Sequence, residues 1–340
     1  MAVNNEPLVS VVVVCLNGLE ISRRCLRGLF SQEYGAKEII VVDNGSSEDI
    51  ETMVKSDFPQ ALFLRLDKNL GFAGGYNRGI EMARGKYVAI INNDALASPL
   101  WLKSLVEAAE KDESIGSVAS VIFDGNRPGV IDSCGVGIAL DGMSRQVMRG
   151  ERLYGTITEK EVLAPSGCAC LYRLSALRRT GAFDESFFAY CEDTDLGLRL
   201  RWAGFRSVIA PGAVVEHAYS MTTGKFSLKK VFYVERNHYW LALKNFPFVL
   251  LILLPVFTIR RYLIQFISIK SKDSGLNRFA EANNILKIME TIITATFSAI
   301  NGIFATLKKR KAIFGAKKIS SMAMLKQIWR HKISMYNILK

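Results

Sequence analysis

Two groups of acidic residues in this sequence have the surroundings that metal or acid–base chemistry requires. Asp94 closes the segment Asn92-Asn93-Asp94, directly after the apolar run Tyr87–Ile91, so it is expected at the end of a buried strand. A carboxylate there is costly unless it binds a partner, and a divalent metal bridging two phosphates is a natural partner. The structural alternative is a helix N-cap ahead of Pro99.

The second group lies between Phe183 and Leu196, where five carboxylates are mixed with four aromatic side chains. Glu192 and Asp193 precede a helix expected to begin near Thr194, where the helix dipole favours charged carboxylates. A carboxylate among aromatic rings that stack on sugar faces suits general-base catalysis on a hydroxyl. A helix cap at Asp193 or Thr194 is the alternative, and both roles can hold together, with Asp193 as base and Asp195 structural.

A glycine-rich segment, Asn69–Gly79, and a single histidine add two further candidates. The glycines permit positive φ, and the helix that they open would present N–H groups to a diphosphate, although a purely structural turn fits as well. The spacing matches neither the dinucleotide fingerprint nor a Walker loop. His217 follows the strand-like Ser207–Ile209 in an expected loop, where a structural role and a metal or phosphate role both remain open.

These segments sit between alternating apolar runs and helical patterns. We expect strands at Val9–Cys15, Glu38–Asp43, Ala61–Arg65, Tyr87–Ile91 and Ile115–Phe123, and helices at Ile21–Ser31, Gly74–Ala83, Pro99–Lys111 and Lys225–Leu243. Ordered structure of no assigned type is expected at Ala164–Arg173 and Ser175–Thr180. This order predicts an α/β fold with a mostly parallel, doubly wound sheet. Ligands bind beyond the carboxyl ends of such strands, where Asn17, Asp43 and Asn92–Asp94 are expected.

Taken in order, these motifs resemble glycosyltransferase family 2. The resemblance rests on five segments: Val9–Asn17, the V-V-D-N-G-S-S stretch ending at Ser47, the N-x-G-x-x-x-G-x-N-x-G loop from Asn69, Asn92-Asn93-Asp94, and Glu192-Asp193-x-Asp195. It covers about Pro7 to Trp240 and is strongest with rhamnosyltransferase-like members. It implies a GT-A fold and an inverting, metal-dependent transferase that uses a nucleotide-diphosphate sugar in cell-surface polysaccharide synthesis.

The resemblance also assigns roles to residues by position. It implies donor binding by Asn17, Asp43, Asn69, Gly71, Gly74, Asn77, Arg78 and Asn93, acceptor or sugar contacts by Gly167, Tyr190, Glu192 and Arg236, a metal site at Asp94 and His217, and a general base at Asp193. The implied cofactor is Mg²⁺ or Mn²⁺, although Asn92 replaces the first acid of the family's D-x-D motif. The implied donor is dTDP-rhamnose or a UDP-hexose, and the acceptor is a saccharide or a lipid-linked saccharide.

Two other functions are weighed against sugar transfer. A nucleotidyltransferase is expected to have a glycine-rich loop and a basic residue after its first strand, and Asn17-Gly18-Leu19-Glu20 lacks both. A non-catalytic nucleotide-sugar-binding or assembly protein is expected to have lost the base or the metal acid, and both Asp94 and Asp193 are present. Glycosidases need two carboxylates flanking the scissile bond and no nucleotide loop, so hydrolysis is disfavoured.

Charge and hydropathy separate the rear of the chain from its front. From Lys225 onward there are 21 Lys/Arg and 4 Asp/Glu, against 23 and 28 before it. This basic charge accompanies the apolar runs Phe246–Phe257 and Ile288–Leu307, which suits an anionic membrane surface, and no nucleic-acid-binding fingerprint is present. We expect two or three amphipathic helices in the membrane interface. A packed helical cap, a homodimer contact and spanning helices are the alternatives.

These patterns also predict domains and location. We expect a catalytic domain over 1–243, with a nucleotide-sugar half (1–120) and an acceptor half (121–243), and a helical, basic, amphipathic region over 244–340. Met1–Pro7 is polar and unlike a signal peptide, so the expected location is cytoplasmic, peripheral on the inner face of the membrane. The six cysteines form no C-x-x-C pair and are expected to be buried thiols.

Overall fold

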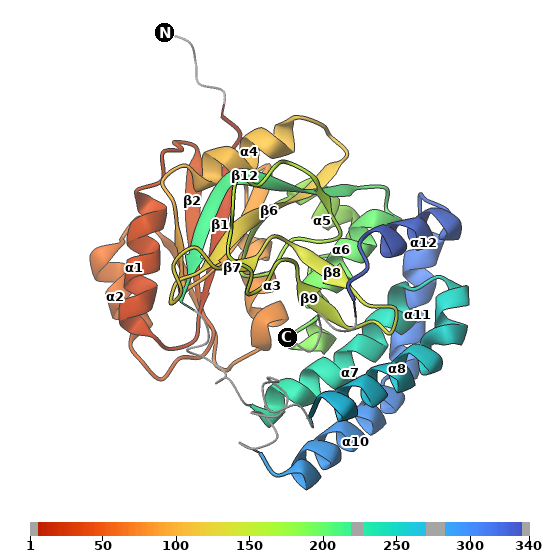
Figure 1. The fold of residues 1–340 in the computed structure, drawn as a ribbon. Helices are drawn as coiled ribbons and strands as arrows, with labels where there is room; N and C mark the ends of the chain where they lie inside the picture. The colour runs from red at the N-terminus through yellow and green to blue at the C-terminus, as the bar shows by residue number, and fades with distance from the viewer. Residues whose placement is uncertain (1–5, 219–226, 270–282, 335–340) are drawn as a thin grey trace. The chain divides into compact units, whose positions relative to one another are not determined.

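The computed structural model describes residues 6–218, 227–269 and 283–334. The chain divides into two compact units (Figure 1). The first unit comprises residues 1–136, 146–200 and 205–222, and the second comprises 137–145, 201–204 and 223–340. The domain division expected at residue 243 stays a prediction.

The first unit is built on one large twisted sheet. Its strands are β1 (Val9–Cys15), β2 (Lys37–Asp43), β3 (Leu62–Arg65), β4 (Tyr87–Asn92), β5 (Ala95–Ala97), β6 (Ile115–Asp124), β7 (Ile131–Ser133), β10 (Glu161–Val162), β11 (Ala169–Arg173) and β12 (Arg206–His217). The order is β10-β12-β6-β11-β4-β1-β2-β3, with β5 paired to β12 and β7 to β6. Strand β1 runs parallel to β2 and β4, with Cys15 beside Asp43 and Val14 beside Asn92.

Helices cover both faces of this sheet. They are α1 (Leu19–Phe30), α2 (Ile50–Asp57), α3 (Gly71–Met82), α4 (Trp101–Glu110), α5 (Leu174–Thr180) and α6 (Glu192–Trp202), whose last two residues belong to the second unit. Because side chains alternate along a strand, Val11 and Val13 enter the core shared with α1, α2 and α4, while Val12 enters the core shared with α3, α5 and α6. The predicted α/β, mostly parallel, doubly wound sheet is confirmed.

Strand β11 departs from the predicted parallel order in a way that matters for the site. It lies antiparallel between β4 and β6. Its amino end therefore lies at the carboxyl end of β4, where the Asn92 N–H donates to the Cys168 carbonyl at 2.8 Å. Strand β12 differs as well. It continues past an irregularity between Ile209 and Val214, so His217 is its last residue and does not lie in the expected loop.

The second unit is helical. It contains α7 (Leu228–Asn245), α8 (Phe248–Ile269), α10 (Ile285–Asn301), α11 (Ile303–Gly315) and α12 (Ser321–Arg330), and the short strands β8 (Val136–Ile138) and β9 (Ser144–Gln146) pair where the chain passes between the units. The helix expected from Lys225 begins at Leu228 in the structure, and 225 and 226 lie outside the described residues.

The apolar run over Ile288–Leu307 is broken at Gly302. There α10 and α11 meet at an angle of 56°. A Cβ atom on Gly302 would lie 2.5 Å from the Trp240 ring, and the Trp240 Nε1–H donates to the Ala299 carbonyl at 2.9 Å. Among the described residues, Phe248–Ile267 is the one unbroken helix long and apolar enough to cross a membrane, and the bent α10–α11 pair passes the same test only when taken together.

The six cysteines are free and buried, as predicted. Burial raises the pKa of Cys25 and Cys170 well above the ordinary thiol value. They therefore act as small core residues and not as reactive thiolates.

Candidate active site

Asn17 joins three loops at the carboxyl edge of the sheet. Its backbone is left-handed, with φ of 60°. Its Oδ1 accepts from the Ser47 N–H at 2.8 Å, its own N–H donates to Ser46 Oγ at 2.8 Å, and its carbonyl accepts from Asn93 Nδ2 at 3.2 Å. The structure thus brings Asn17 and Asn93 together, and both organise the strand ends around Asp43 and Asp94.

Asp43 is fully buried directly behind this edge. Its Oδ1 accepts from the Ser46 N–H at 2.9 Å. Its Oδ2 lies 3.2 Å from Arg65 Nη1 but accepts no hydrogen bond from the described residues. An unsatisfied buried acceptor is costly, and a ligand N–H would relieve that cost. Arg65 is half-exposed and forms an ion pair with this oxygen, so a ligand N–H at Oδ2 would compete with Arg65.

The glycine-rich segment is anchored to the end of β2 by Asn44. The Asn44 side chain donates to the Gly71 carbonyl at 3.0 Å and to Asn69 Oδ1 at 3.2 Å. Asn44 follows Asp43 in the motif quoted from the sequence, but we assigned it no role. Only the fold shows that it determines where α3 begins.

The start of α3 packs against the turn at Phe188. The Ala73 N–H donates to the Phe188 carbonyl at 3.3 Å, and a Cβ atom on Gly71 would lie 2.3 Å from that same oxygen. This backbone approach explains Gly71, whose φ is +75°. Two first-turn N–H groups of α3 are already used by the protein, because the Gly71 N–H donates to Asn69 Oδ1 at 2.7 Å as well. Diphosphate binding by Gly71 and Gly74 stays a prediction.

Gly71→Ala is expected to destabilise the fold by about 2–4 kcal/mol, because positive φ and overlap with Phe188 add together. Gly150→Ala is the matched control, since Gly150 has φ of +81° and no described atom lies within 4 Å of its Cβ position. The control should lose only about 1 kcal/mol. Urea unfolding of both variants measures the difference, and equal losses would contradict close packing at Phe188.

Asn77 and Arg78 point toward the turn at residues 183–185. Asn77 Nδ2 donates to the Phe183 carbonyl at 2.9 Å and to Glu185 Oε1 at 3.0 Å. Arg78 pairs with Glu81 and, at 3.4 Å, with Glu185. Both residues hold α3 to this turn, and their predicted contact with the donor stays a prediction.

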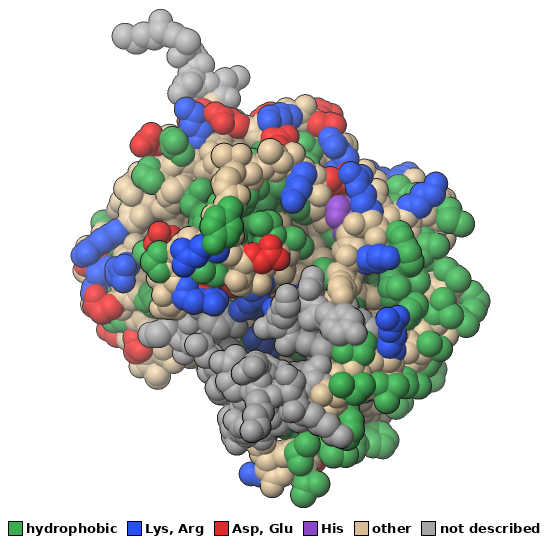
Figure 2. All heavy atoms as spheres, in the orientation of Figure 1, with side chains coloured by type: hydrophobic (Ala, Val, Ile, Leu, Met, Phe, Trp, Pro, Cys, Tyr) green, Lys and Arg blue, Asp and Glu red, His purple; other side chains and the backbone are tan. Residues whose placement is uncertain are grey.

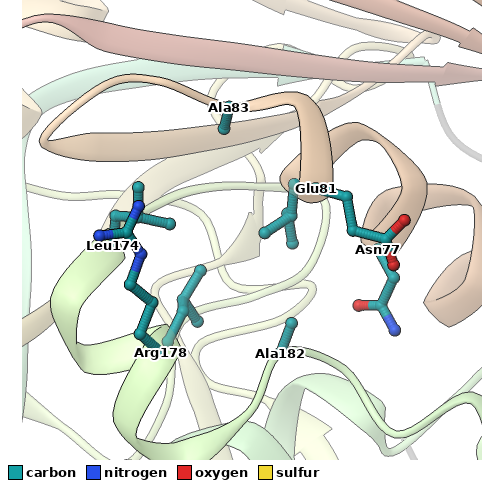
Figure 3. Close-up of a pocket in the computed structure, with 8 residues that line it drawn as sticks. Asn77, Glu81, Ala83, Leu174, Arg178 and Ala182 are labelled. Atoms are coloured by element: carbon teal, nitrogen blue, oxygen red, sulfur yellow. The ribbon is translucent and has the colours of Figure 1, made fainter.

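Asn77 also lines a pocket of about 440 Å³ between α3 and α5 (Figure 3). In Figure 3, Asn77 and Glu81 lie on one side of the pocket and Arg178 on the opposite side. Its remaining lining residues are Ile80, Ala83, Leu174, Leu177 and Ala182. The pocket includes neither the predicted base nor the predicted metal residues.

His217 lies between two buried carboxylates. Its Nε2 is 3.3 Å from Asp94 Oδ1 and its Nδ1 is 3.0 Å from Asp132 Oδ2. Burial alone would lower the pKa of His217, but Cys168, Asp132 and Asp94 raise it well above its usual value. We did not predict Asp132 from the sequence. It lies on β7, a three-residue strand in a stretch where the periodic pattern is weak.

Asp193 is held by the backbone on both sides. Its Oδ2 accepts from the Gly167 N–H at 3.1 Å, and its Oδ1 accepts from the Thr194 N–H at 2.6 Å. Burial raises the pKa of Asp193, while these hydrogen bonds oppose the rise. Gly167 has no space for a side chain, because a Cβ atom would lie 2.8 Å from the Phe72 ring.

The predicted base and the predicted metal pair are linked to two adjacent residues. The Gly167 N–H donates to Asp193, and the thiol of the next residue, Cys168, contributes to the raised pKa of His217, the partner of Asp94. Asp193 and His217 therefore each interact with the segment Gly167–Cys168. The antiparallel β11 creates this arrangement.

Backbone strain is concentrated just before the predicted base. Phe188, Tyr190 and Cys191 have φ of 64°, 70° and 70°. Left-handed non-glycine residues cost about 1–3 kcal/mol each and cluster at functional sites. The strain orients the chain that enters α6 at Glu192.

Asp195 has the structural role expected for it. Its carboxylate accepts from Arg199 Nε at 2.8 Å, with both side chains buried. Arg199 also donates to the carbonyls of Thr180, Gly181 and Ala182. Through Arg199, Asp195 thus holds α6 against the end of α5. Its carboxylate is engaged in this structural pair.

Glu192 is buried with an unsatisfied carboxyl oxygen. No described residue hydrogen-bonds its Oε2. Burial, together with the charge of Asp193, raises the pKa of Glu192 well above its usual value. The raised pKa favours the protonated form of Glu192, and this form would offer an O–H donor beside the Asp193 carboxyl group.

The stability of the Glu192→Gln variant relative to wild type is expected to increase as pH rises. The pKa of Glu192 is higher in the folded protein than in the unfolded chain, which ionises Glu192 above about pH 4.3, so the contribution of Glu192 to wild-type stability is lost as pH rises above that value. Glutamine removes this dependence. Denaturant unfolding of both proteins at pH 4 and pH 7 measures it, with the exposed Glu216→Gln as control. An unchanged difference between wild type and variant at the two pH values would contradict the buried neutral acid.

Two predicted residues remain outside this cluster. Tyr190 lies in the strained turn, half-buried. Arg236 belongs to the second unit, where its guanidinium stacks on Trp240 at 4.3 Å and Nε donates to Asn237 at 2.9 Å. Its role toward the acceptor stays a prediction.

The residues 6–218, 227–269 and 283–334 contain no group of three or more His, Cys, Asp or Glu placed to bind one metal ion. Asp94 and His217 are a pair, with Asp132 on the far nitrogen of the histidine. This cluster therefore supplies at most two direct ligands to a metal ion, Asp94 and His217.

Comparison with known proteins gives consistent results. N-acetylglucosaminyl-diphospho-decaprenol L-rhamnosyltransferase of Mycobacterium tuberculosis is 29% identical over 211 residues, which cover 55% of this chain and 68% of that protein. Poly-beta-1,6-N-acetyl-D-glucosamine synthase of Staphylococcus aureus is 23% identical over 240 residues, covering 68% and 54%.

Solved structures share the fold. The mannosyltransferase PcManGT of Pyrobaculum calidifontis, in complex with GDP-Man and Mn²⁺, superposes with a TM-score of 0.57 at 18% identity, covering 97% of this chain and 89% of that one. TarS 1–349 of S. aureus gives 0.53 at 14%, covering 91% and 90%. These neighbours confirm the predicted GT-A type of fold.

The sequence profile described as Glycosyl transferase family 2 matches residues 10–181, which is 172 of 340 residues and so just over half of the chain. The matched region contains β1 to β4, the glycine-rich segment, Asp94 and Gly167. The chain is a glycosyltransferase and belongs to glycosyl transferase family 2.

Proposed function

We propose that this chain is an inverting, metal-dependent glycosyltransferase that transfers one sugar from a nucleotide-diphosphate donor to a saccharide or lipid-linked saccharide in cell-surface polysaccharide synthesis. One observation carries the proposal. Asp193 accepts from the Gly167 N–H, and His217, the partner of Asp94, interacts with the side chain of the next residue, Cys168, so the candidate base and the candidate metal pair are linked to adjacent residues.

Asp193 acts as the base in this proposal. It takes the proton of the acceptor hydroxyl while that oxygen bonds to the anomeric carbon, and the bond from this carbon to the diphosphate oxygen breaks. A single displacement inverts the anomeric centre. Hydrogen bonds from Gly167 and Thr194 fix the carboxylate, and base catalysis of this kind contributes typically about 10²–10⁴-fold.

The residues around His217 fit a divalent cation. His217 Nδ1 faces Asp132 and Nε2 faces Asp94, and a ligating histidine usually has such a carboxylate on its other nitrogen, so a metal ion that displaced the Nε2 proton would be held by Nε2 and Asp94. The 3.3 Å between Nε2 and Asp94 Oδ1 places two potential donor atoms side by side, and these two residues would hold the ion. Mg²⁺ or Mn²⁺ commonly completes its shell with substrate phosphates and water, and it would offset the charge of the leaving diphosphate.

Asp132→Ala is expected to weaken Mn²⁺ binding about 10–100-fold, because Nδ1 loses the acceptor that orients the ring. Asp132→Asn keeps an oxygen near Nδ1 and should lose less. Mn²⁺ binding is followed by electron paramagnetic resonance without any turnover. Unchanged affinity in the alanine variant would remove Asp132 from the metal site.

The donor proposal is dTDP-rhamnose first and UDP-hexoses second. Support comes from the rhamnosyltransferase relative and from Asp43 Oδ2, an unsatisfied acceptor for the ring N–H of a pyrimidine. The name of that relative includes a decaprenol-linked saccharide, which supports a lipid-linked acceptor here.

We further propose that the chain works on the cytoplasmic side, peripheral on the inner face of the membrane.

A donor-hydrolysis and transfer screen across dTDP-, UDP- and GDP-sugars, with and without Mn²⁺, tests the proposal. We expect Mn²⁺-dependent release of dTDP or UDP. Tight nucleotide binding with no hydrolysis and no transfer would favour the non-catalytic binding protein. Formation of a nucleotide sugar from a nucleoside triphosphate would favour the nucleotidyltransferase.

A further inference from the structure

Helix α10 buries small apolar residues and exposes large ones, which is the reverse of a helix on the surface of a water-soluble protein. It buries Ala295 and Ala299, at 0% and 5% exposure. Large side chains are exposed along its outer face and at the start of α11, namely Leu286, Met289, Ile293, Phe297, Ile300 and Phe304. Water-exposed helices bury large apolar residues and expose polar ones, so this face requires a non-aqueous partner.

Helix α8 has the same character. Its outer face exposes Phe248, Ile252, Val256, Ile259, Leu263 and Phe266, at helical spacing. Figure 2 shows hydrophobic side chains gathered along the lower right of the view, where Figure 1 places α8, α10 and α11. We call the exposed residues of these three helices the apolar surface.

The opposite face of α8 carries a buried arginine. Arg261 Nε donates to Asp141 Oδ2 at 2.6 Å, and its two terminal nitrogens donate to the Glu235 carboxylate of α7 at 2.7 and 2.9 Å. A helix crossing a bilayer alone would break this cluster and leave a charge in hydrocarbon, which is costly. The cluster instead attaches α8 sideways to α7, so α8 lies along its own unit.

The charge beside the apolar surface is strongly basic. Residues 283–334 contain ten Lys/Arg and one Asp/Glu, including Lys308-Lys309-Arg310-Lys311 on α11. At the end of α12, Lys332 lies 3.4 Å over the exposed Trp329 ring. Two such basic faces repel each other in a homodimer, whereas anionic lipid headgroups attract them. Tryptophan and lysine at one position are typical of a membrane interface.

We propose that the apolar surface of α8, α10 and α11 binds an anionic lipid bilayer, with these helices lying in the plane of its interface and not across it. The large apolar side chains enter the acyl region while Lys308, Lys309 and Lys311 lie near the headgroups. This deepens the proposed membrane-side function but rests on the second unit alone.

Vesicle flotation of the full-length protein tests the proposal. We expect binding to vesicles of phosphatidylcholine with phosphatidylglycerol, and much weaker binding to phosphatidylcholine alone. Phe297→Ser with Phe304→Ser should lower the affinity at least about tenfold. Tyr154→Ser is the matched control, because Tyr154 in the first unit and Phe304 are both 86% exposed. Lys308→Gln, Lys309→Gln and Lys311→Gln together should remove the preference for anionic vesicles.

Three results would overturn the proposal. Retention of the protein in bilayers after alkaline carbonate extraction would indicate spanning helices. No vesicle binding, together with a lipid-free dimer that the Phe297/Phe304 variant disrupts, would indicate a contact between copies. Equal loss of vesicle binding in the Tyr154 control would make the effect non-specific. Donor hydrolysis in detergent-free solution is measured separately, so failure of the membrane proposal and failure of the proposed function are distinguishable.

Discussion

Asp193→Asn is expected to lower the turnover number by about 10²–10⁴-fold while donor affinity changes little. Asparagine keeps one acceptor oxygen for the Gly167 or Thr194 N–H, so the local backbone should remain in place. It cannot take the acceptor proton. Single-turnover transfer and nucleotide calorimetry separate the two effects, and normal turnover by the variant would remove the assignment of the base.

Asp195→Asn is the control for that substitution. It changes the same group two residues away, on the same helix, but breaks the buried pair with Arg199 at 2.8 Å. Loss of one partner of a buried pair typically costs about 3–5 kcal/mol. This variant should unfold at lower temperature and, below that temperature, keep its turnover. Similar turnover losses in both variants would mean that the Asp193 effect is structural.

Asp94→Ala is expected to abolish the Mn²⁺-dependent part of donor binding, a loss of at least about 100-fold, because it removes one of two candidate ligands. Calorimetry of the nucleotide with and without Mn²⁺ measures this loss. Affinity without metal should change little. If Mn²⁺ strengthens nucleotide binding equally in wild type and variant, Asp94 does not bind the metal.

Asp124→Ala provides the matched control for Asp94. Asp124 ends strand β6 in register with His217 of β12, but its carboxylate accepts from Arg127 Nε at 2.7 Å and from the Asn126 N–H at 2.9 Å. Its loss should leave Mn²⁺-dependent binding intact. A comparable loss in this control would indicate a general electrostatic effect of removing an acid from this edge of the sheet.

The sequence predicted the structure well where the pattern within a single strand or helix was sufficient to place it. The continuous β-branched run Val9–Cys15 and the apolar runs before Asp43 and Asn92 predicted parallel strands whose ends meet. These strands predicted that Asp43 and Asp94 lie at the carboxyl ends of parallel strands, and they predicted the α/β fold class. The residue roles themselves remain predictions, because position does not measure chemistry.

The sequence was least informative where pairing between distant segments decided the geometry. The antiparallel direction of β11 has no local signature, and three-residue β7 gives no period from which to place Asp132. The glycine-rich segment fitted a phosphate site and a packed turn equally well. Only the approach of Phe188 to Gly71 shows that the turn contributes. Likewise, the break at Gly302 depends on Trp240, far away in sequence.

The segment Gly167–Cys168 has a consequence for how this enzyme can change over evolution. Gly167 holds the predicted base, and the adjacent Cys168 interacts with the histidine of the predicted metal pair, so an insertion or deletion between these two residues would change both sites at once. The long excursion from Asp124 to Leu163 leaves the sheet and returns to it without including these two residues, but it contains Asp132, the partner of His217 Nδ1. We therefore expect new substrate preferences to arise by lengthening or rewriting the parts of the excursion outside β7, where the contacts of Asp193 and His217 are not altered.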